Sequence, residues 1–139
     1  MILLDTSGLL AAIDSGQRLH TRCVNALKSS GPPYLLSPFV LAELDYLLYT
    51  KVGLAAQIAL LEEVAAGVYA LETFEKADVS RALSIVKRFA DLAIGLADAS
   101  LVVLAERHKI CDVLTLDERH FRALRAHGQK RFRILPADL

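Results

Sequence analysis

Four acidic residues occupy positions at which an α/β protein usually meets a ligand. Asp5 directly follows the apolar run 2–4, and Asp117 directly follows a second apolar run. Asp98 lies in the first turn of a predicted helix, and Glu43 lies inside another predicted helix. Ligands of open parallel sheets bind beyond the carboxyl ends of the strands, where the following helices begin. We therefore expect the four acids to share one edge of a sheet.

The sequence around these acids is apolar, which points to metal chemistry. Asp98 shares its predicted helix face with Leu101, Val102 and Ala105, and Glu43 has apolar neighbours at helical spacing on both sides. A buried carboxylate is costly unless it is paired or binds a metal, and converging carboxylates raise one another's pKa values. A hard divalent cation relieves both effects, and all-oxygen ligands suit Mg²⁺ or Mn²⁺ rather than Zn²⁺. The pattern thus predicts a buried Mg²⁺ or Mn²⁺ site.

Each acid also has a purely structural explanation. Asp5 and Asp98 suit helix N-caps, Asp117 suits a turn, and Glu43 suits a buried acid paired with an arginine. The arrival of all four at one predicted edge favours a shared site over four separate explanations.

Three further acids have similar surroundings. Spacing alone does not prefer Glu43 over Asp45, which also lies among apolar neighbours. Asp91 and Asp112 are candidates as well. For Asp45, Asp91 and Asp112 a surface or capping role is the favoured interpretation.

The elements that must position these acids alternate between short strands and helices. Such alternation predicts right-handed crossovers and a mainly parallel central sheet in a three-layer α/β/α architecture. The predicted strands cover 2–4, 34–36, 68–71, 112–116 and 131–135. A helix is predicted directly after Asp5, and the others cover 17–29, 38–49, 54–66, 75–90, 97–108 and 118–126. The helix over 38–49 is apolar on every face except for two acids, so we expect it to be buried.

Composition limits the class of protein. The chain has 139 residues, 54% of them hydrophobic, which predicts a single domain over 1–139 with a substantial core. The 16 basic and 16 acidic side chains exclude a uniformly basic nucleic-acid-coating protein. The charge is nevertheless uneven: residues 1–106 hold 8 basic and 12 acidic side chains, and residues 107–139 hold 8 and 4. The basic end suits contact with a polyanion or simple solvation.

The sequence also indicates the cellular compartment in which the protein is expected. Cys23 and Cys111 form no paired motif and suit small core residues in a reducing cytoplasm. No stretch reaches the roughly 20 apolar residues of a membrane span. The N-terminus lacks a basic segment of the kind that begins a signal peptide. We expect a cytoplasmic protein without a membrane segment.

Four motifs, taken in order, resemble those of PIN-domain nucleases. They are Asp-Thr-Ser (5–7), Ser-Pro-Phe-Val-Leu-Ala-Glu-Leu (37–44), Gly-Leu-Ala-Asp-Ala-Ser-Leu-Val-Val-Leu-Ala-Glu-Arg (95–107) and Val-Leu-Thr-Leu-Asp-Glu-Arg-His-Phe (113–121). The resemblance spans the chain, and its compact form looks most like VapC-type toxins of toxin–antitoxin pairs.

This resemblance implies a PIN-like fold and Mg²⁺- or Mn²⁺-dependent cleavage of RNA by a toxin. Asp5, Asp98 and Asp117 would be the metal ligands. Glu43, chosen over Asp45 by the family pattern, would complete the catalytic set as a ligand or as a proton acceptor. Thr6, Ser7 and Thr115 would support the acids through their hydroxyls. The implied partners are an RNA substrate, a VapB-type antitoxin docking on the helices over 38–49 and 54–66, and a second copy in a homodimer.

Binding of RNA also requires cations near the acids. Arg119, Arg122 and Arg125 recur every three residues after Asp117 and are candidates for phosphate contacts, with a solvated helix face as the alternative. The four histidines suit surface or packing positions, and only His120 lies close enough in sequence to support a metal acid.

Two other classes of protein remain as alternatives. A phospho-acceptor receiver domain would place paired acids after the first strand and a lysine near the last, whereas here Thr6-Ser7 follows Asp5 and Lys130 precedes the last strand. A catalytically silent PIN scaffold that binds RNA or protein would not need all four acids.

Overall fold

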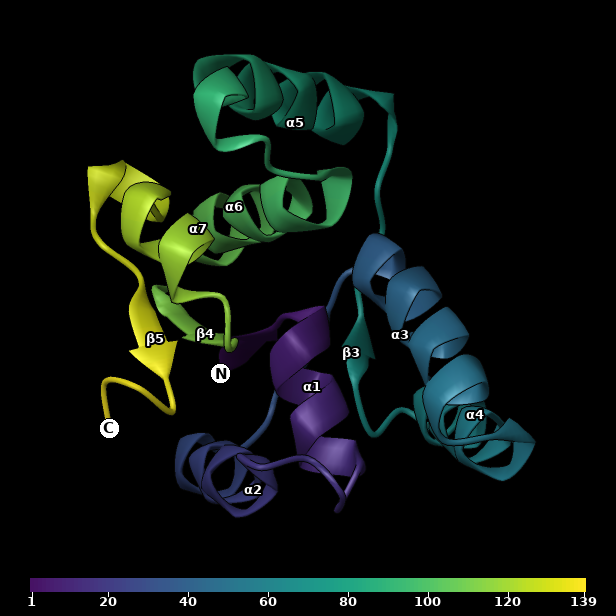
Figure 1. Cartoon of the computed structure of the whole chain (residues 1–139). Helices are drawn as coiled ribbons and strands as arrows, with labels where there is room; N and C mark the ends of the chain where they lie inside the picture. The colour runs from purple at the N-terminus through teal and green to yellow at the C-terminus, as the bar shows by residue number, and fades with distance from the viewer.

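A five-stranded parallel sheet forms the centre of the computed structural model, which describes residues 1–139 (Figure 1). Every paired neighbour in the sheet is parallel, and the strand order is β3-β2-β1-β4-β5. The strands are short and apolar: β1 (Ile2–Leu4), β2 (Tyr34–Leu36), β3 (Ala70–Leu71), β4 (Asp112–Leu114) and β5 (Arg133–Leu135). The predicted parallel sheet is confirmed.

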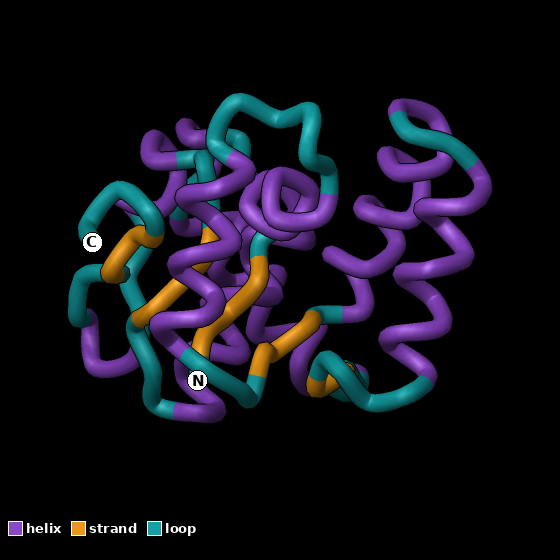
Figure 2. Tube along the Cα trace, turned by 90° about the horizontal axis from the view of Figure 1, so that it is seen from below, coloured by secondary structure: helices purple, strands orange, loops and turns teal.

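Seven α-helices connect the strands and cover the sheet. They are α1 (Thr6–Ile13), α2 (His20–Ser30), α3 (Pro38–Lys51), α4 (Leu54–Ala65), α5 (Lys76–Arg88), α6 (Leu96–His108) and α7 (Glu118–Ala123), with short 3-10 turns at Ala90–Leu92 and His127–Gln129. Helices α1 and α2 lie on one side of the sheet, and α6 lies on the other with α5 outside it (Figure 1). Figure 2, seen from below, shows the strands running between these helical layers. The three-layer architecture is therefore confirmed.

The sheet reverses its strand order next to β1. The chain moves outward from β1 to β2 and β3, then returns to place β4 on the other side of β1. The carboxyl ends of β1 and β4 consequently lie side by side at a topological switch point, where α/β proteins bind ligands. Asp5 follows β1 and Thr115 follows β4 at this point.

Helix α1 begins in close contact with the end of β4. A Cβ atom on Gly8 would lie 2.5 Å from the carbonyl oxygen of Leu114, a separation that real Cβ atoms do not adopt. Glycine at this position therefore allows the first turn of α1 to pack against the end of β4.

Helix α6 runs through the interior of the protein. Eight of the thirteen residues of α6 are buried, and all of them except Ser100 are apolar. The strands β1, β2 and β4 are buried on both faces, as expected for a covered parallel sheet. The N-terminal end of α6, which carries Asp98, is therefore held by packing on several sides.

One prediction about helices was wrong, and one helix ends earlier than predicted. Helix α3 is not buried all round: only Val40, Leu44 and Leu48 are buried, because α3 packs at the side of the molecule against α1 and α4. The predicted helix over 118–126 ends at Ala123, since Leu124 adopts an extended backbone. The other helices and strands lie at the predicted places, with ends that differ by a few residues.

No helix is both long and apolar enough to cross a membrane.

Candidate functional site

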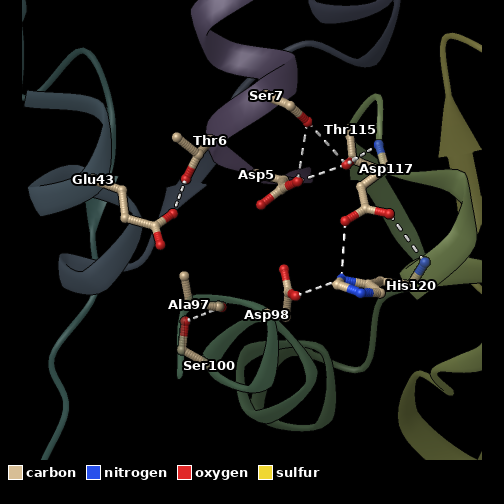
Figure 3. Close-up of polar contacts among 10 residues, drawn as sticks. All are labelled: Asp5, Thr6, Ser7, Glu43, Ala97, Asp98, Ser100, Thr115, Asp117 and His120. Atoms are coloured by element: carbon tan, nitrogen blue, oxygen red, sulfur yellow. Dashed lines mark hydrogen bonds and ion pairs between the residues drawn. The ribbon is translucent and has the colours of Figure 1, made fainter. Parts of the chain in front are cut away.

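A cavity of about 490 Å³ opens at the switch point of the sheet. It contains all four acids singled out from the sequence, which come from four separate segments of the chain (Figure 3). Its lining comprises Asp5, Thr6, Ser7, Leu10, Gln17, Glu43, Leu47, Lys51, Gly95, Ala97, Asp98, Leu116, Asp117 and His120. The structure thus brings Asp5, Glu43, Asp98 and Asp117 together.

Asp5 is the most buried of the four acids, with 5% of its surface exposed. Its Oδ2 accepts hydrogen bonds from the hydroxyl of Thr115 at 2.6 Å and from that of Ser7 at 3.2 Å. Burial raises the pKa of Asp5 to about 6, and the neighbouring charge of Asp98 adds to the rise, while the two hydroxyls oppose it. Its other carboxylate oxygen points toward the space between the acids (Figure 3).

The hydroxyls of Ser7 and Thr115 also hold the loop that carries Asp117. The backbone N–H of Leu116 donates to Ser7 Oγ at 3.0 Å, and that of Asp117 donates to Thr115 Oγ1 at 2.9 Å. These two side chains therefore link Asp5 to the loop after β4, so a shift of either acid would disturb the other.

Asp98, Asp117 and His120 form the tightest group of metal-ligating atoms, all within 4.8 Å of one another. His120 Nδ1 lies 2.9 Å from an oxygen of Asp98 and 2.9 Å from an oxygen of Asp117. Asp117 also caps α7, because its Oδ1 accepts from the backbone N–H of His120 at 3.0 Å. Burial, together with the charge of Asp117, raises the pKa of Asp98, although the His120 contact opposes this.

Glu43 differs from the expectation, because its side chain is exposed rather than buried. Helix α3 lies at the edge of the molecule and turns Glu43 toward the cavity mouth, where Thr6 Oγ1 donates to it at 2.7 Å. Asp45 points elsewhere and accepts from Gln57 Nε2 of α4 at 2.8 Å. The geometry therefore distinguishes Glu43 from Asp45, which spacing alone did not.

A buried pair of serines ties α3 to α6 beside the acids. Ser37 and Ser100 are both fully buried, and their hydroxyl oxygens lie 2.7 Å apart. Ser100 also donates to the carbonyl of Ala97 at 2.6 Å (Figure 3). Ser37 caps α3 by accepting from the N–H of Phe39. This contact fixes the start of the helix carrying Glu43 against the start of the helix carrying Asp98.

The other acids and the cysteines lie outside the cavity. Asp91 is exposed in a 3-10 turn, and Asp112 at the start of β4 pairs with Arg133 at 3.1 Å. Cys23 is buried and Cys111 is half-buried, both as free thiols.

Sequence reasoning missed two polar residues of the cavity wall and underestimated the role of a third. Gln17 and Lys51 line it from the α1–α2 loop and the end of α3, and no local motif marks either residue. His120 was expected at most to support the acids, but its ring lies between two of them. Its position three residues after Asp117, inside a short helix, was the one available signal.

The three arginines after Asp117 do not form one free stripe. Arg122 donates to both carboxylate oxygens of Asp138, at 2.8 and 2.7 Å, and to Glu118. Arg125 lies beyond the end of α7, and its Nη1 donates to the last carbonyls of that helix. Only Arg119 is exposed without a hydrogen bond or ion pair from its side chain.

The residues at this site fit a hard divalent cation. The donor set is mainly carboxylate oxygen, and burial raises the pKa values of Asp5 and Asp98. A bound cation would offset this penalty by favouring the ionised carboxylates.

Comparisons with known proteins agree with this geometry. The family model described as PIN domain matches residues 2–126. The chain is 43% identical over 135 residues to "Ribonuclease VapC26" of Mycobacterium tuberculosis, covering 97% of this chain and all of that protein.

Two solved structures share the fold. The crystal structure of Mycobacterium tuberculosis VapC20, described as a sarcin-ricin loop cleaving toxin, matches with a TM-score of 0.79 and 22% identity over 86% of this chain and 92% of that chain. A toxin–antitoxin complex from Klebsiella pneumoniae matches with a TM-score of 0.67 and 17% identity over 89% and 92%.

Proposed function

The chain belongs to the PIN-domain family, and from that premise we propose that it is a metal-dependent endoribonuclease, the toxin of a type II toxin–antitoxin pair. The observation that carries the proposal is that Asp5, Glu43, Asp98 and Asp117 line one cavity in a chain 43% identical to a protein named as a ribonuclease. The family assignment sets aside a receiver domain.

The metal ligands in this proposal are Asp5, Asp98 and Asp117, and the metal is Mg²⁺ or Mn²⁺. A divalent cation held by these three carboxylates would supply a water of lowered pKa and would neutralise charge on the phosphate. Thr115 and Ser7 hold one oxygen of Asp5, which leaves the other directed at the cavity. His120 holds Asp98 and Asp117 at a fixed separation.

Glu43 is placed to accept a proton. It is exposed at the cavity mouth, and the Thr6 hydroxyl fixes the orientation of its carboxylate at 2.7 Å. A positioned carboxylate in contact with solvent can take a proton from an attacking water and release it to bulk solvent. Thr6 is therefore a positioning residue in this proposal.

The test is cleavage of RNA by the purified protein. We expect total RNA to be cut at discrete sites in Mg²⁺ or Mn²⁺, to stay intact in EDTA, and to be cut again when Mn²⁺ is restored. Protein carrying Asp117→Asn, purified in parallel, should leave the RNA intact, which excludes a contaminating nuclease. Intact RNA with the unmodified protein in Mn²⁺ would instead favour a catalytically silent scaffold.

The proposed partners are a VapB-type antitoxin and a second copy of the chain. Helices α3 and α4 expose apolar side chains that a folded monomer would normally cover: Tyr46, Tyr49, Val52, Leu54, Ile58 and Leu61. This surface, next to the cavity mouth formed by Glu43 and Lys51, suits an antitoxin segment that reaches the acids. RNA cleavage under the control of an antitoxin takes place in the cytoplasm, which is the proposed location of the protein.

Co-expression with the product of a neighbouring short reading frame tests the antitoxin surface. Tyr49→Asp with Ile58→Asp should abolish co-purification, whereas Leu83→Asp on the exposed face of α5 should retain it. Light scattering of the free protein reports the dimer, against a chain mass of 15.2 kDa.

A further inference from the structure

A second cavity, of about 380 Å³, adjoins the cavity of the acids. Its walls come from the α1–α2 loop, α2, the loop after β4, the start of α7 and the segment after β5. They comprise Arg18, Leu19, Arg22, Thr115, Leu116, Glu118, Pro136 and Ala137. Leu116 lines both cavities. Along the α1–α2 loop, Gln17 lines the first cavity and its neighbour Arg18 lines the second. The two cavities are therefore neighbours that share Leu116.

The second cavity is basic where the first is acidic. Arg18 and Arg22 provide two exposed guanidinium groups. Arg18 makes no ion pair or side-chain hydrogen bond, and Arg22 makes a single contact of 3.4 Å to the carbonyl of Pro136. The one acid in the lining, Glu118, is paired with Arg122 at 2.9 Å. The two arginines thus keep most of their hydrogen-bond donors free for an anion.

The loop that carries Arg18 has a defined shape. The carboxylate of Asp14 accepts from the N–H of Gly16 at 3.0 Å and from Gln17 Nε2 at 3.1 Å. His20 at the start of α2 contacts the carbonyl of Ala11 at 2.8 Å. These contacts close the α1–α2 connection on itself and fix the backbone on either side of Arg18, whose side chain lines the second cavity.

An RNA substrate needs cations near the acidic cavity, where Lys51 lines the wall and Arg119 is exposed, whereas the other two arginines after Asp117 are bound within the protein. Arg122 is bound to Asp138, and Arg125 is bound to backbone carbonyls. We propose that Arg18 and Arg22 hold a phosphate of the RNA strand that flanks the phosphate being cleaved. A cavity of about 380 Å³ falls in the size range of sites for small ligands, which suits one nucleotide unit. This inference rests on the proposed ribonuclease function.

Binding under metal-free conditions tests the proposed phosphate site. A labelled random-sequence RNA decamer is titrated with protein in EDTA at several KCl concentrations. The variant R18Q/R22Q should bind more weakly, and the slope of log Kd against log salt should fall by about 0.7 for each phosphate of the single strand that the variant no longer neutralises. The matched control K76Q/K87Q removes two charges from the two ends of α5 and should keep the slope of the unmodified protein. Equal slopes for the two double variants would overturn the proposal.

RNA that carries one uncharged linkage can locate the phosphate that Arg18 and Arg22 are proposed to hold. A methylphosphonate, which carries no charge, is moved one position at a time along a cleavable RNA on both sides of the cut. At one flanking position the methylphosphonate should lower kcat/KM for the unmodified protein. At the same position it should not lower kcat/KM further for R18Q/R22Q, because this variant already lacks the arginines that would bind the charge. Additive decreases at every position would contradict the proposal.

Different results would contradict the proposed ribonuclease function and the proposed phosphate site. If the unmodified protein cuts no RNA in Mn²⁺, the proposed function fails. If it cuts RNA and R18Q/R22Q behaves as K76Q/K87Q does in both experiments, only the phosphate site fails.

Discussion

At the residue scale, the buried acids Asp5 and Asp98 are poorly stabilised as anions by the protein alone. Asp5 is almost fully buried, with a pKa raised to about 6, and burial also raises the pKa of Asp98. The hydroxyls of Thr115 and Ser7 recover part of the lost solvation of Asp5 but not all of it. The protein therefore holds these acids in place at some expense of its own stability.

Removing the charge of Asp5 should stabilise the metal-free protein above pH 6. The folded-state pKa of Asp5, about 6, exceeds the ordinary value of 3.8, so the folded protein binds more protons than the unfolded chain between these values. Stability contributed by this group is present below pH 3.8 and lost as the pH rises through 6. Asp5→Asn does not titrate, so its advantage over the unmodified protein should grow from pH 4 to pH 8 by up to about 3 kcal/mol.

Denaturant unfolding in EDTA at pH 4, 6 and 8 measures this difference. The control Asp91→Asn makes the same substitution at an exposed acid outside the cavity. A difference between Asp5→Asn and the unmodified protein that is independent of pH would show that Asp5 is not destabilised as an anion.

Substitutions of Glu43 and Asp45 provide a matched test of the catalytic role proposed for Glu43. The two acids lie two residues apart on α3, but only Glu43 faces the cavity, while Asp45 binds Gln57. Glu43→Gln should lower kcat for RNA cleavage by about 100-fold or more, as expected for loss of a general base. Asp45→Asn should leave kcat unchanged. Similar decreases in the two variants would remove Glu43 from its assigned role.

At the element scale, the site depends on how closely α1 approaches β4. Gly8 allows this approach, and the Thr115 and Ser7 hydroxyls then span the gap between the two elements. Gly8→Ala should destabilise the fold by about 1–3 kcal/mol through overpacking, despite the higher helix propensity of alanine. Thermal unfolding checks this, with Gly95→Ala as control, because a Cβ there meets no atom within 4 Å. Equal stability of the two variants would contradict the packing argument.

Much of this element-level arrangement follows from local sequence. Short apolar runs flanked by caps predict the five strands, and their alternation with helices predicts the parallel sheet and hence the edge that gathers Asp5, Asp98 and Asp117. The exposure of α3 could not be predicted from the sequence pattern. A helix with apolar residues on most faces is expected to be buried in a core, and the pattern does not distinguish this from an apolar surface that a partner covers. The exposed position of Glu43 has the same cause.

Contacts between distant segments were also beyond sequence patterns. Arg122 looked free for RNA, yet it binds Asp138, which lies beyond the end of β5. Gln17 and Arg18 lie in a loop without a motif, and only the fold brings them beside the loop after β4. Such pairings depend on three-dimensional packing, for which spacing along the chain carries no signal.

At the scale of the whole molecule, the net charge of zero hides an uneven distribution of acidic and basic side chains. The 16 acidic side chains include the four of the cavity, and the 16 basic ones include Arg18 and Arg22 in the adjoining cavity. In the proposed function the acids would attract a cation, and the neighbouring arginines would favour the polyanion that the acids alone would repel. Placing opposite charges in adjoining cavities accounts for how a neutral protein can bind and cut RNA.

The central claim is that the gathered acids form one metal-dependent centre for cutting RNA. The most direct measurement is the initial rate of RNA cleavage in Mn²⁺ by Asp98→Asn beside Asp91→Asn, two variants with the same change of charge seven residues apart. We predict that Asp98→Asn loses cleavage and that Asp91→Asn cleaves at the rate of the unmodified protein. Equal cleavage by Asp98→Asn and the unmodified protein would contradict the account.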